Sequence, residues 1–142
     1  MANLVVDSSV AVKWFVVEPY SAEARKILNE YQNGSISFLA PDLINAEFGN
    51  IIWKKHNFQG LAAADAQSIM DDFRALQFTF IPTATLLDDA YQLAVKHRRT
   101  VYDSLYLALS LRENCQCVTA DEKFVNAVGP AFTNLIWLAN WS

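Results

Sequence analysis

Short apolar runs alternate with longer amphipathic segments along the whole chain, and this alternation limits the choice of fold more than any other feature. The apolar runs occupy residues 4–6, 36–40, 78–81, 117–119 and 135–138. The segments with helical spacing occupy residues 10–15, 21–32, 43–56, 62–76, 86–98, 100–113 and 122–128. Because strands that alternate with helices form parallel sheets covered on both faces, we expect an α/β fold with a central, mostly parallel sheet.

Length and composition favour one globular domain. The chain has 142 residues, 53% of them hydrophobic and 18% charged, and shows no internal repeat, linker or low-complexity segment. We therefore expect a single domain over residues 1–142. No apolar run approaches the roughly 20 residues of a membrane span, and the first residues lack the basic region of a signal peptide. These features predict a cytoplasmic protein with no membrane partner.

The formal net charge of −4 argues against a broad nucleic-acid-binding surface, which is usually basic. It is compatible with a nucleic-acid enzyme whose own site is acidic and which reaches phosphates through metal ions. Cys115 and Cys117 are one residue apart on an expected strand. This spacing suits no disulfide, and the chain has too few further Cys and His residues for a zinc site. We expect both thiols to be reduced.

Four acidic residues occupy positions that would bring them to one edge of the sheet. Asp7 and Asp121 each follow an apolar strand, and the carboxyl ends of parallel strands are where ligands bind in such sheets. Glu47 lies within the apolar stripe of the helix expected over 43–56, where an unpaired carboxylate is costly. Asp103 lies in the first turn of a helix that is apolar nearly all round and is therefore expected to be central.

Each of these acids also has a structural interpretation. Asp7 fits a turn, Asp121 fits the N-cap of the next helix, and Asp103 with Thr100 fits the spacing of a capping box. Glu47 is the hardest to explain in this way. Four independent coincidences are less probable than one shared site, and a residue such as Asp121 can cap a helix and serve the site as well.

Clustered carboxylates with no Cys or His nearby suit Mg²⁺ or Mn²⁺. Such a cation relieves the repulsion between the acids, binds a phosphodiester oxygen and lowers the pKa of an attacking water. The chemistry that we expect is phosphodiester hydrolysis. The hydroxyl groups of Ser8 and Thr119 flank the acids and would support the site, although local hydrogen bonding to the backbone explains them equally well.

The remaining polar residues have structural interpretations. We expect Ser8 or Ser9 to cap the helix over 10–15 and Asp42 to cap the helix over 43–56. Glu18 fits a cap or a solvated position, and Lys55 is expected in solvent with Lys54. The two histidines, at positions 56 and 97, lie at helix ends among basic residues, and neither fits a general base.

Four short stretches follow one another in an order that is specific when taken together. They are Val5-Val6-Asp7-Ser8-Ser9 with Val12-Lys13-Trp14-Phe15 after it, Ala40-Pro41-Asp42-Leu43 leading to Glu47, Tyr102-Asp103-Ser104-Leu105-Tyr106 with Ala108 following, and Val118-Thr119-Ala120-Asp121-Glu122-Lys123-Phe124. In these stretches the chain resembles the PIN-domain ribonucleases, and among them the toxins of VapBC-type toxin–antitoxin pairs. The resemblance runs essentially from end to end.

The resemblance implies a PIN-like three-layer α/β/α fold and a catalytic, metal-binding tetrad at Asp7, Glu47, Asp103 and Asp121. The family's supporting hydroxyl groups fall on Ser8 and Thr119. The implied activity is that of a Mg²⁺- or Mn²⁺-dependent endoribonuclease acting on RNA such as tRNA or rRNA. The implied partners are a second copy in a homodimer and a cognate antitoxin protein.

Two surfaces are candidates for partner contacts. The early helix is unusually apolar, which fits either a partner-binding face or simple core packing; the residues concerned are Val12, Trp14, Phe15, Val16 and Val17. Basic residues that could hold RNA phosphates at the rim of the site, or be ordinary solvated charges, are Lys13, Lys54, Lys55, Arg98, Arg99 and Lys123.

Other classes of protein fit less well. A haloacid-dehalogenase-type phosphatase needs a second acid two residues after the first, where this chain has Ser9. A receiver domain needs an acidic pair near the first strand and a phosphoacceptor on a middle strand, and both are missing. A housekeeping RNA-processing nuclease and a non-enzymatic PIN-like interaction module remain as alternatives, and the intact tetrad argues against the second.

Overall fold

A computed structural model describes residues 2–142 and contains a central sheet of five parallel strands. The strands are β1 (Ala2–Val6), β2 (Ile36–Pro41), β3 (Thr79–Ile81), β4 (Gln116–Thr119) and β5 (Leu135–Trp137). Their order across the sheet is β3-β2-β1-β4-β5, and every neighbouring pair is parallel. The predicted α/β architecture is confirmed.

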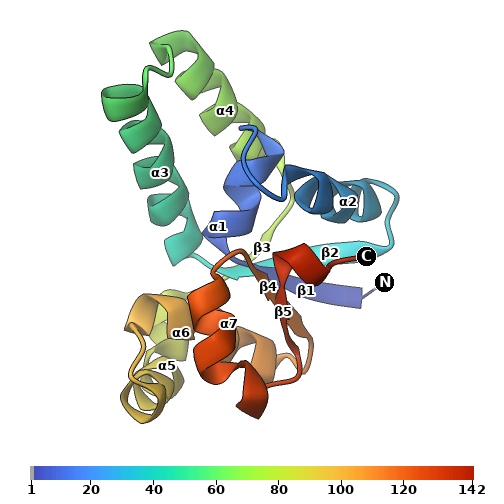
Figure 1. Ribbon diagram of the computed structural model, residues 1–142, viewed down its shortest axis with the longest axis vertical. Coiled ribbons are helices and arrows are strands. Elements are labelled where there is room, and N and C mark those ends of the chain that lie inside the picture. The colour runs from blue at the N-terminus through green and yellow to red at the C-terminus, as the bar shows by residue number, and fades with distance from the viewer. Residues whose placement is uncertain (1) are drawn as a thin grey trace.

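Helices cover both faces of the sheet and make three layers (Figure 1). On one side of the sheet are α1 (Ser8–Ala11), the 3-10 turn η1 (Val12–Trp14), α2 (Ser21–Gln32), α3 (Leu43–Gln59) and α4 (Ala63–Ala75). On the other side are α5 (Thr83–His97), α6 (Val101–Arg112) and α7 (Glu122–Val128). Two further 3-10 turns, η2 (Gly129–Ala131) and η3 (Leu138–Asn140), flank β5. Within residues 2–142, no helix is both long and apolar enough to cross a membrane.

The strand order reverses at β1, which fixes the place of the site. The chain adds β2 and β3 on one side of β1, and then β4 and β5 on the other side. The backbone N–H of Asp7 donates to the carbonyl of Val118 (3.2 Å), so the carboxyl ends of β1 and β4 lie side by side. In open α/β sheets, ligands bind outside the carboxyl ends of the strands where the order reverses. Asp7 and Asp121 lie at that point.

The core is built from the central strands and from α6. Leu4, Val5 and Val6 of β1 are almost fully buried, as the continuous apolar run predicted. All residues from 104 to 110 are buried as well, and α6 packs on β1, β2 and β4. The expectation that this helix is central is therefore confirmed, and Asp103 is carried at the start of a rigid element.

The start of the first helix differs from the prediction. Helix α1 begins at Ser8 and not at residue 10, and its N-cap is Asp7, whose carboxylate accepts a hydrogen bond from the N–H of Ser9. The expected cap at Ser8 or Ser9 is wrong, because the carboxylate that ends β1 is already in the capping position. Asp7 thus belongs to the strand end and to the helix start at once.

Most of the apolar early segment belongs to the core. Val12 and Trp14 are buried; the indole N–H of Trp14 donates to the carbonyl of Ala24 (2.9 Å), and its ring stacks on Phe38. Phe15 and Val16 are partly buried, whereas Val17 is 81% exposed. The partner-face interpretation is therefore wrong for Val12 and Trp14, and core packing explains their apolar character.

Helix α3 is also capped differently from the prediction. Asp42 makes no side-chain bond to the first turn of α3. Its carboxylate accepts from the N–H and the hydroxyl of Thr83 (2.9 and 2.5 Å), and the Thr83 hydroxyl oxygen accepts the N–H of Leu43 (3.1 Å). The first turns of α3 and α5 are thereby joined through one threonine, a long-range cap that local spacing could not reveal.

Glu18 joins two lysines that were expected to be free. The Nζ of Lys13 lies 3.1 Å and that of Lys55 2.6 Å from the two carboxylate oxygens of Glu18, and all three side chains are largely buried. Burial raises the pKa of Glu18, but the hydrogen bonds and charges of Lys55 and Lys13 outweigh it, so the pKa is lowered overall. The expectations of a solvated Lys55 and a solvated or capping Glu18 are wrong. Cys117 is buried, Cys115 is partly buried, and both are free thiols as predicted.

Candidate acidic active site

Asp7 is held by hydroxyl and amide donors from two strand ends. Its Oδ1 accepts from the Ser8 hydroxyl (3.2 Å) and the Ser9 N–H (3.3 Å), and its Oδ2 accepts from the Thr119 hydroxyl (2.8 Å). Thr119 is 112 positions away in sequence and lies at the end of β4. The carboxylate is therefore fixed in orientation by groups that carry no positive charge.

The end of β4 is fixed by the same network. The Thr119 oxygen accepts the N–H of Asp121 (3.1 Å), and the Ser9 hydroxyl oxygen accepts the N–H of Ala120 (3.1 Å). Asp121 in turn accepts the N–H of Phe124 (3.1 Å) and is the N-cap of α7. The predicted capping role of Asp121 is confirmed, and its capping bond uses Oδ1.

Glu47 approaches the sheet edge from α3. Its Oε1 accepts a hydrogen bond from the hydroxyl group of Tyr106 on α6, and the Ser8 hydroxyl lies 3.4 Å from the same oxygen. Ser8 thus lies between the carboxylates of Asp7 and Glu47, whose positions are 40 residues apart in the sequence. The structure brings these two predicted residues together.

Asp103 approaches from the first turn of α6. Its N–H donates to the Thr100 hydroxyl oxygen (3.1 Å), which is one half of the predicted capping box. Besides burial, the negative charges of Asp7 and Asp121 both raise the pKa of the Asp103 carboxyl group, so the three acids lie near enough to repel one another. The four acids therefore come from the ends of β1 and β4 and from the helices α3 and α6.

Burial and mutual repulsion make several of these carboxyl groups hard to ionise. Burial raises the pKa of Asp7 above its usual value, although hydrogen bonds from Thr119, Ser9 and Ser8 oppose the rise. Burial also raises the pKa of Glu47, and the charges of Asp7 and Asp103 add to the effect, against the hydrogen bond from Tyr106. The pKa of Asp103 is raised by burial and by the charge of Asp7. Such shifts are typical of functional sites.

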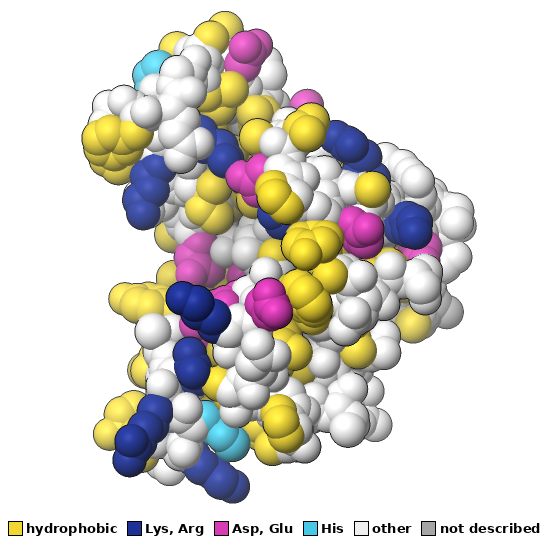
Figure 2. Space-filling view, viewed as in Figure 1, with side chains coloured by type: hydrophobic (Ala, Val, Ile, Leu, Met, Phe, Trp, Pro, Cys, Tyr) yellow, Lys and Arg dark blue, Asp and Glu magenta, His cyan; other side chains and the backbone are white. Residues whose placement is uncertain are grey.

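Several acidic side chains lie together in the waist of the molecule, between α3 and the layer of α5 and α6, with basic side chains near them, and others are scattered over the same face (Figure 2). None of the four acids forms a salt bridge with a basic residue in the described part of the chain. Over residues 2–142, no three His, Cys, Asp or Glu side chains lie close enough to hold a metal ion directly. The acids thus influence one another without forming a tight cage.

The basic residues considered as RNA contacts differ in their exposure and in their partners. Lys13 and Lys55 are paired with Glu18 inside the protein, so the prediction that they contact RNA is not supported by their position. Arg99 acts through its charge on Asp103 and is partly exposed. The remaining candidates have exposed side chains: Lys54, Arg98 and Lys123.

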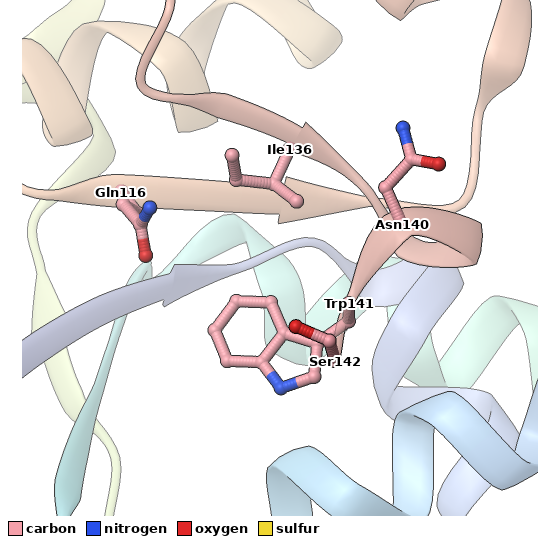
Figure 3. A pocket seen from close by; sticks show the side chains of 5 residues that line it. All are labelled: Gln116, Ile136, Asn140, Trp141 and Ser142. Atoms are coloured by element: carbon pink, nitrogen blue, oxygen red, sulfur yellow. The ribbon is translucent and has the colours of Figure 1, made fainter.

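A separate cavity lies away from the acids (Figure 3). Its lining is Gln116, Ile136, Asn140, Trp141 and Ser142. Gln116 begins β4, whereas Thr119 ends it, so the cavity lies toward the opposite end of the strand from the site. Its lining offers no acidic side chain for a cation.

Two residues of the network were not predicted to belong to the site. Tyr106 contacts Glu47, and Ser9 holds the loop that carries Asp121. A signal for Tyr106 was present, because it follows Asp103 by three positions and therefore shares its face of the helix. A phenol in an otherwise aliphatic buried helix also needs a hydrogen-bond partner. Ser9 gave no comparable signal, since serine after a strand is common in turns.

Residues 4–129 match the PIN domain family. Ribonuclease VapC3 from Pyrobaculum aerophilum is 35% identical over 137 residues, which cover 90% of this chain and 99% of that protein.

Solved structures share the fold at low identity. PAE2754 from Pyrobaculum aerophilum superposes with a TM-score of 0.64 at 17% identity, covering 97% of this chain and 92% of the other. VapBC2 from Rickettsia felis, bound to a DNA fragment from its promoter, gives 0.62 at 16% identity, covering 95% and 96%. A toxin–antitoxin complex from Klebsiella pneumoniae gives 0.61 at 12% identity, covering 95% and 97%. At these identities the likeness concerns the fold.

Proposed function

The chain belongs to the PIN-domain family, and from this premise we propose that it is a metal-dependent endoribonuclease that acts as the toxin of a toxin–antitoxin pair. The curated relative that it resembles over nearly its whole length is named a ribonuclease. Two solved structures that share its fold are VapBC2 from Rickettsia felis and a toxin–antitoxin complex from Klebsiella pneumoniae. These names belong to those proteins, and they support the proposal here together with the site.

The observation that carries the proposal is the acidic network itself. Asp7 and Glu47 share the Ser8 hydroxyl, and their carboxyl groups have raised pKa values without any basic residue bonded to them. An arrangement that only stabilised the fold would pair such buried acids with lysine or arginine. The chain does this elsewhere, at Glu18, so the unpaired acids at the sheet edge indicate a site kept for a cation.

The donor set fits Mg²⁺ or Mn²⁺. Carboxylate oxygens are the ligands that these hard cations prefer. Mg²⁺ commonly keeps several water molecules and takes only one or two carboxylates directly. A group of acids that repel one another without forming a close trio suits such a partly hydrated cation. We therefore propose that Asp7, Glu47, Asp103 and Asp121 together hold it.

In this proposal the neighbouring hydroxyl and amide groups of the protein orient the acids. A bound cation would neutralise charge on the phosphodiester and lower the pKa of the attacking water, so that water adds to phosphorus as the P–O bond of the leaving strand breaks. Ser8 and Thr119 hold Asp7, and Thr119 also holds the backbone of Asp121. These contacts would keep the carboxylates in place throughout hydrolysis.

We propose RNA of the tRNA or rRNA class as the substrate, a homodimer as the working form, and a cognate antitoxin as the inhibitor, all in the cytoplasm. Contacts to RNA phosphates would come from basic residues that are exposed or partly exposed, namely Lys54, Arg98, Arg99 and Lys123. Exposed apolar side chains support contacts with protein partners, among them a stripe at helical spacing on α5 formed by Leu87, Tyr91 and Val95.

The direct test is cleavage of total RNA by purified protein with Mg²⁺ or Mn²⁺. The wild type should cleave, and Asp103→Asn should lose at least about 100-fold in rate, since one of the acids that hold the cation is neutralised. Asp88→Asn, which removes an exposed carboxylate on α5, is the matched control and should retain full activity. Addition of a chelator should stop the reaction.

Equal cleavage by the wild type and Asp103→Asn would show that the acids are not the catalytic site. Cleavage that persists in the chelator would contradict metal dependence while leaving ribonuclease activity in place. Expression of the wild type, but not of Asp103→Asn, should arrest growth when the antitoxin is missing; growth that continues would contradict the toxin role.

A further inference from the structure

Tyr106 lies in the core, and its hydroxyl group donates a hydrogen bond to one of the four acids. The residue is only 2% exposed, and its hydroxyl bonds to Oε1 of Glu47. The Ser8 hydroxyl lies near this same oxygen, at 3.4 Å. The other oxygen, Oε2, has no hydrogen bond within residues 2–142. Both protein donors therefore lie on one side of the carboxylate, and the second oxygen is left for another partner.

Ser8 cannot hold Glu47 alone. A hydroxyl group carries one proton, and Ser8 has two carboxylate oxygens in reach, Oδ1 of Asp7 at 3.2 Å and Oε1 of Glu47 at 3.4 Å. Tyr106 donates its one hydroxyl proton to Glu47, and its oxygen is a further hydrogen-bond partner of Ser8. Its backbone is part of α6 and its ring is enclosed by the core, so the position of its hydroxyl group is set by a buried helix.

We propose that Tyr106 is a positioning residue, which holds Oε1 of Glu47 against the protein and so turns Oε2 toward the cation of the acidic site. The inference rests on the proposed function, because it assumes that a cation binds among the four acids. It gives a role in the site to a residue that lies in one of the motif stretches but outside the acid tetrad.

Core packing alone does not account for the hydroxyl group. A phenylalanine ring would fill the same space, and it would avoid the cost of taking a phenol out of water. A hydrogen bond to a charged acceptor offsets this cost and fixes the acceptor's direction. Groups that orient a metal-binding residue in this way contribute about 10-fold to 100-fold to metal affinity. The hydroxyl group is thus the part of Tyr106 that serves the site.

Titration with Mn²⁺ by calorimetry tests the proposal without any RNA. Tyr106→Phe removes one oxygen atom and keeps the ring, so the fold should persist and its thermal midpoint can be checked separately. The variant should bind Mn²⁺ about 10-fold more weakly than the wild type. Tyr20→Phe is the matched control, because it removes the hydroxyl of a 43% exposed tyrosine just before α2, and its affinity should equal that of the wild type.

A double-mutant cycle with Glu47→Gln shows whether Tyr106 acts through Glu47. In the Glu47→Gln background, adding Tyr106→Phe should weaken Mn²⁺ binding by less than threefold, a much smaller loss than in the wild type. An equal loss in both backgrounds would show that the phenol acts independently of Glu47 and would overturn the proposal. Wild-type affinity in Tyr106→Phe would overturn it as well.

The outcomes separate this inference from the proposed function. If the wild type binds Mn²⁺ and Tyr106→Phe binds it equally well, only the positioning role fails. If the wild type binds no Mn²⁺, the metal-dependent function fails together with the positioning role. A crystal structure of the wild type with Mn²⁺ needs no variant: Oε2 of Glu47 should face the cation, and a cation on Oε1 would overturn the proposal.

Discussion

Asp7 combines three tasks that usually fall to different residues. It ends β1, caps α1 through the N–H of Ser9, and receives the Thr119 hydroxyl from β4. Each task fixes its carboxylate in a buried position where ionisation is costly, as the raised pKa shows. A residue placed only for capping would do as well with the neutral side chain of asparagine, so the charge itself is expected to serve the cation.

Replacement of Asp7 by asparagine should therefore stabilise the metal-free protein while it abolishes cleavage. The amide keeps a capping oxygen but removes a buried charge that the other acids repel. We expect the thermal midpoint without metal to rise by about 3 °C, which corresponds to roughly 1 kcal/mol for a chain of this size. Thermal unfolding in chelator measures this shift, and a lower midpoint than in the wild type would contradict it.

The stability difference between Asp7→Asn and the wild type should also depend on pH. The pKa of Asp7 is raised in the folded protein above its ordinary value of 3.8. Protonated Asp7 therefore adds its full stabilisation to the folded state below that value, and this stabilisation is lost as the pH rises through the folded pKa. The advantage of Asp7→Asn over the wild type should vanish in acid and grow toward neutral pH. Unfolding curves of both proteins over this range measure the difference, and a gap that shrinks as the pH rises would have the wrong sign.

At the scale of elements, the sequence was sufficient to predict the strands and the central helix. Continuous apolar runs such as Leu4-Val5-Val6 predicted buried parallel strands, and the nearly all-apolar segment over 100–113 predicted the central helix α6. Asp7 and Asp121 could be placed at one edge because both follow strands. The roles of the four acids in catalysis stay predictions.

What the sequence could not show depends on contacts between distant residues. The cap of α3 comes from Thr83, forty positions further along, and Glu18 pairs with Lys55 across 37 positions. Local spacing carries no information on such pairs. The bond from Tyr106 to Glu47 belongs to the same class, since it joins α6 to α3.

The buried group of Lys13, Glu18 and Lys55 should contribute to stability by joining η1 to α3. Glu18→Gln leaves two lysine ammonium groups without a countercharge, and we expect a loss of about 1–3 kcal/mol, less than for a fully buried pair because Glu18 is partly accessible. Denaturant unfolding measures it. Asp71→Asn, which breaks the exposed pair with Arg74, is the control and should change nothing measurable. Equal stability of both variants would contradict the structural role of Glu18.

At the scale of the whole molecule, an acidic chain is expected to bind an acidic polymer through a few local cations. With a net charge of −4, attraction to RNA must come from the basic rim and from the bound metal. Arg99, whose charge acts on Asp103, is the basic residue with the most direct link to the site.

Arg99→Ala should therefore reduce the salt dependence of RNA binding. If Arg99 contacts one phosphate of a single strand, its loss should lower the slope of log affinity against log salt by about 0.7. Binding is measured in the Asp7→Asn background, so that the RNA stays intact. Lys26→Ala, on the exposed face of α2, is the control and should leave the slope unchanged. An unchanged slope in Arg99→Ala would remove Arg99 from the RNA-binding rim.

The central claim is that four carboxylates from two strand ends and two helices form one cation site. Anomalous diffraction from crystals soaked in Mn²⁺ tests this claim most directly, because it locates the ion without reference to activity. We expect one or two peaks about 2.2 Å from carboxylate oxygens of Asp7 or its acidic neighbours, and their loss in Asp7→Asn. A wild-type crystal with Mn²⁺ only at exposed surface acids, and none between β1 and β4, would contradict the account.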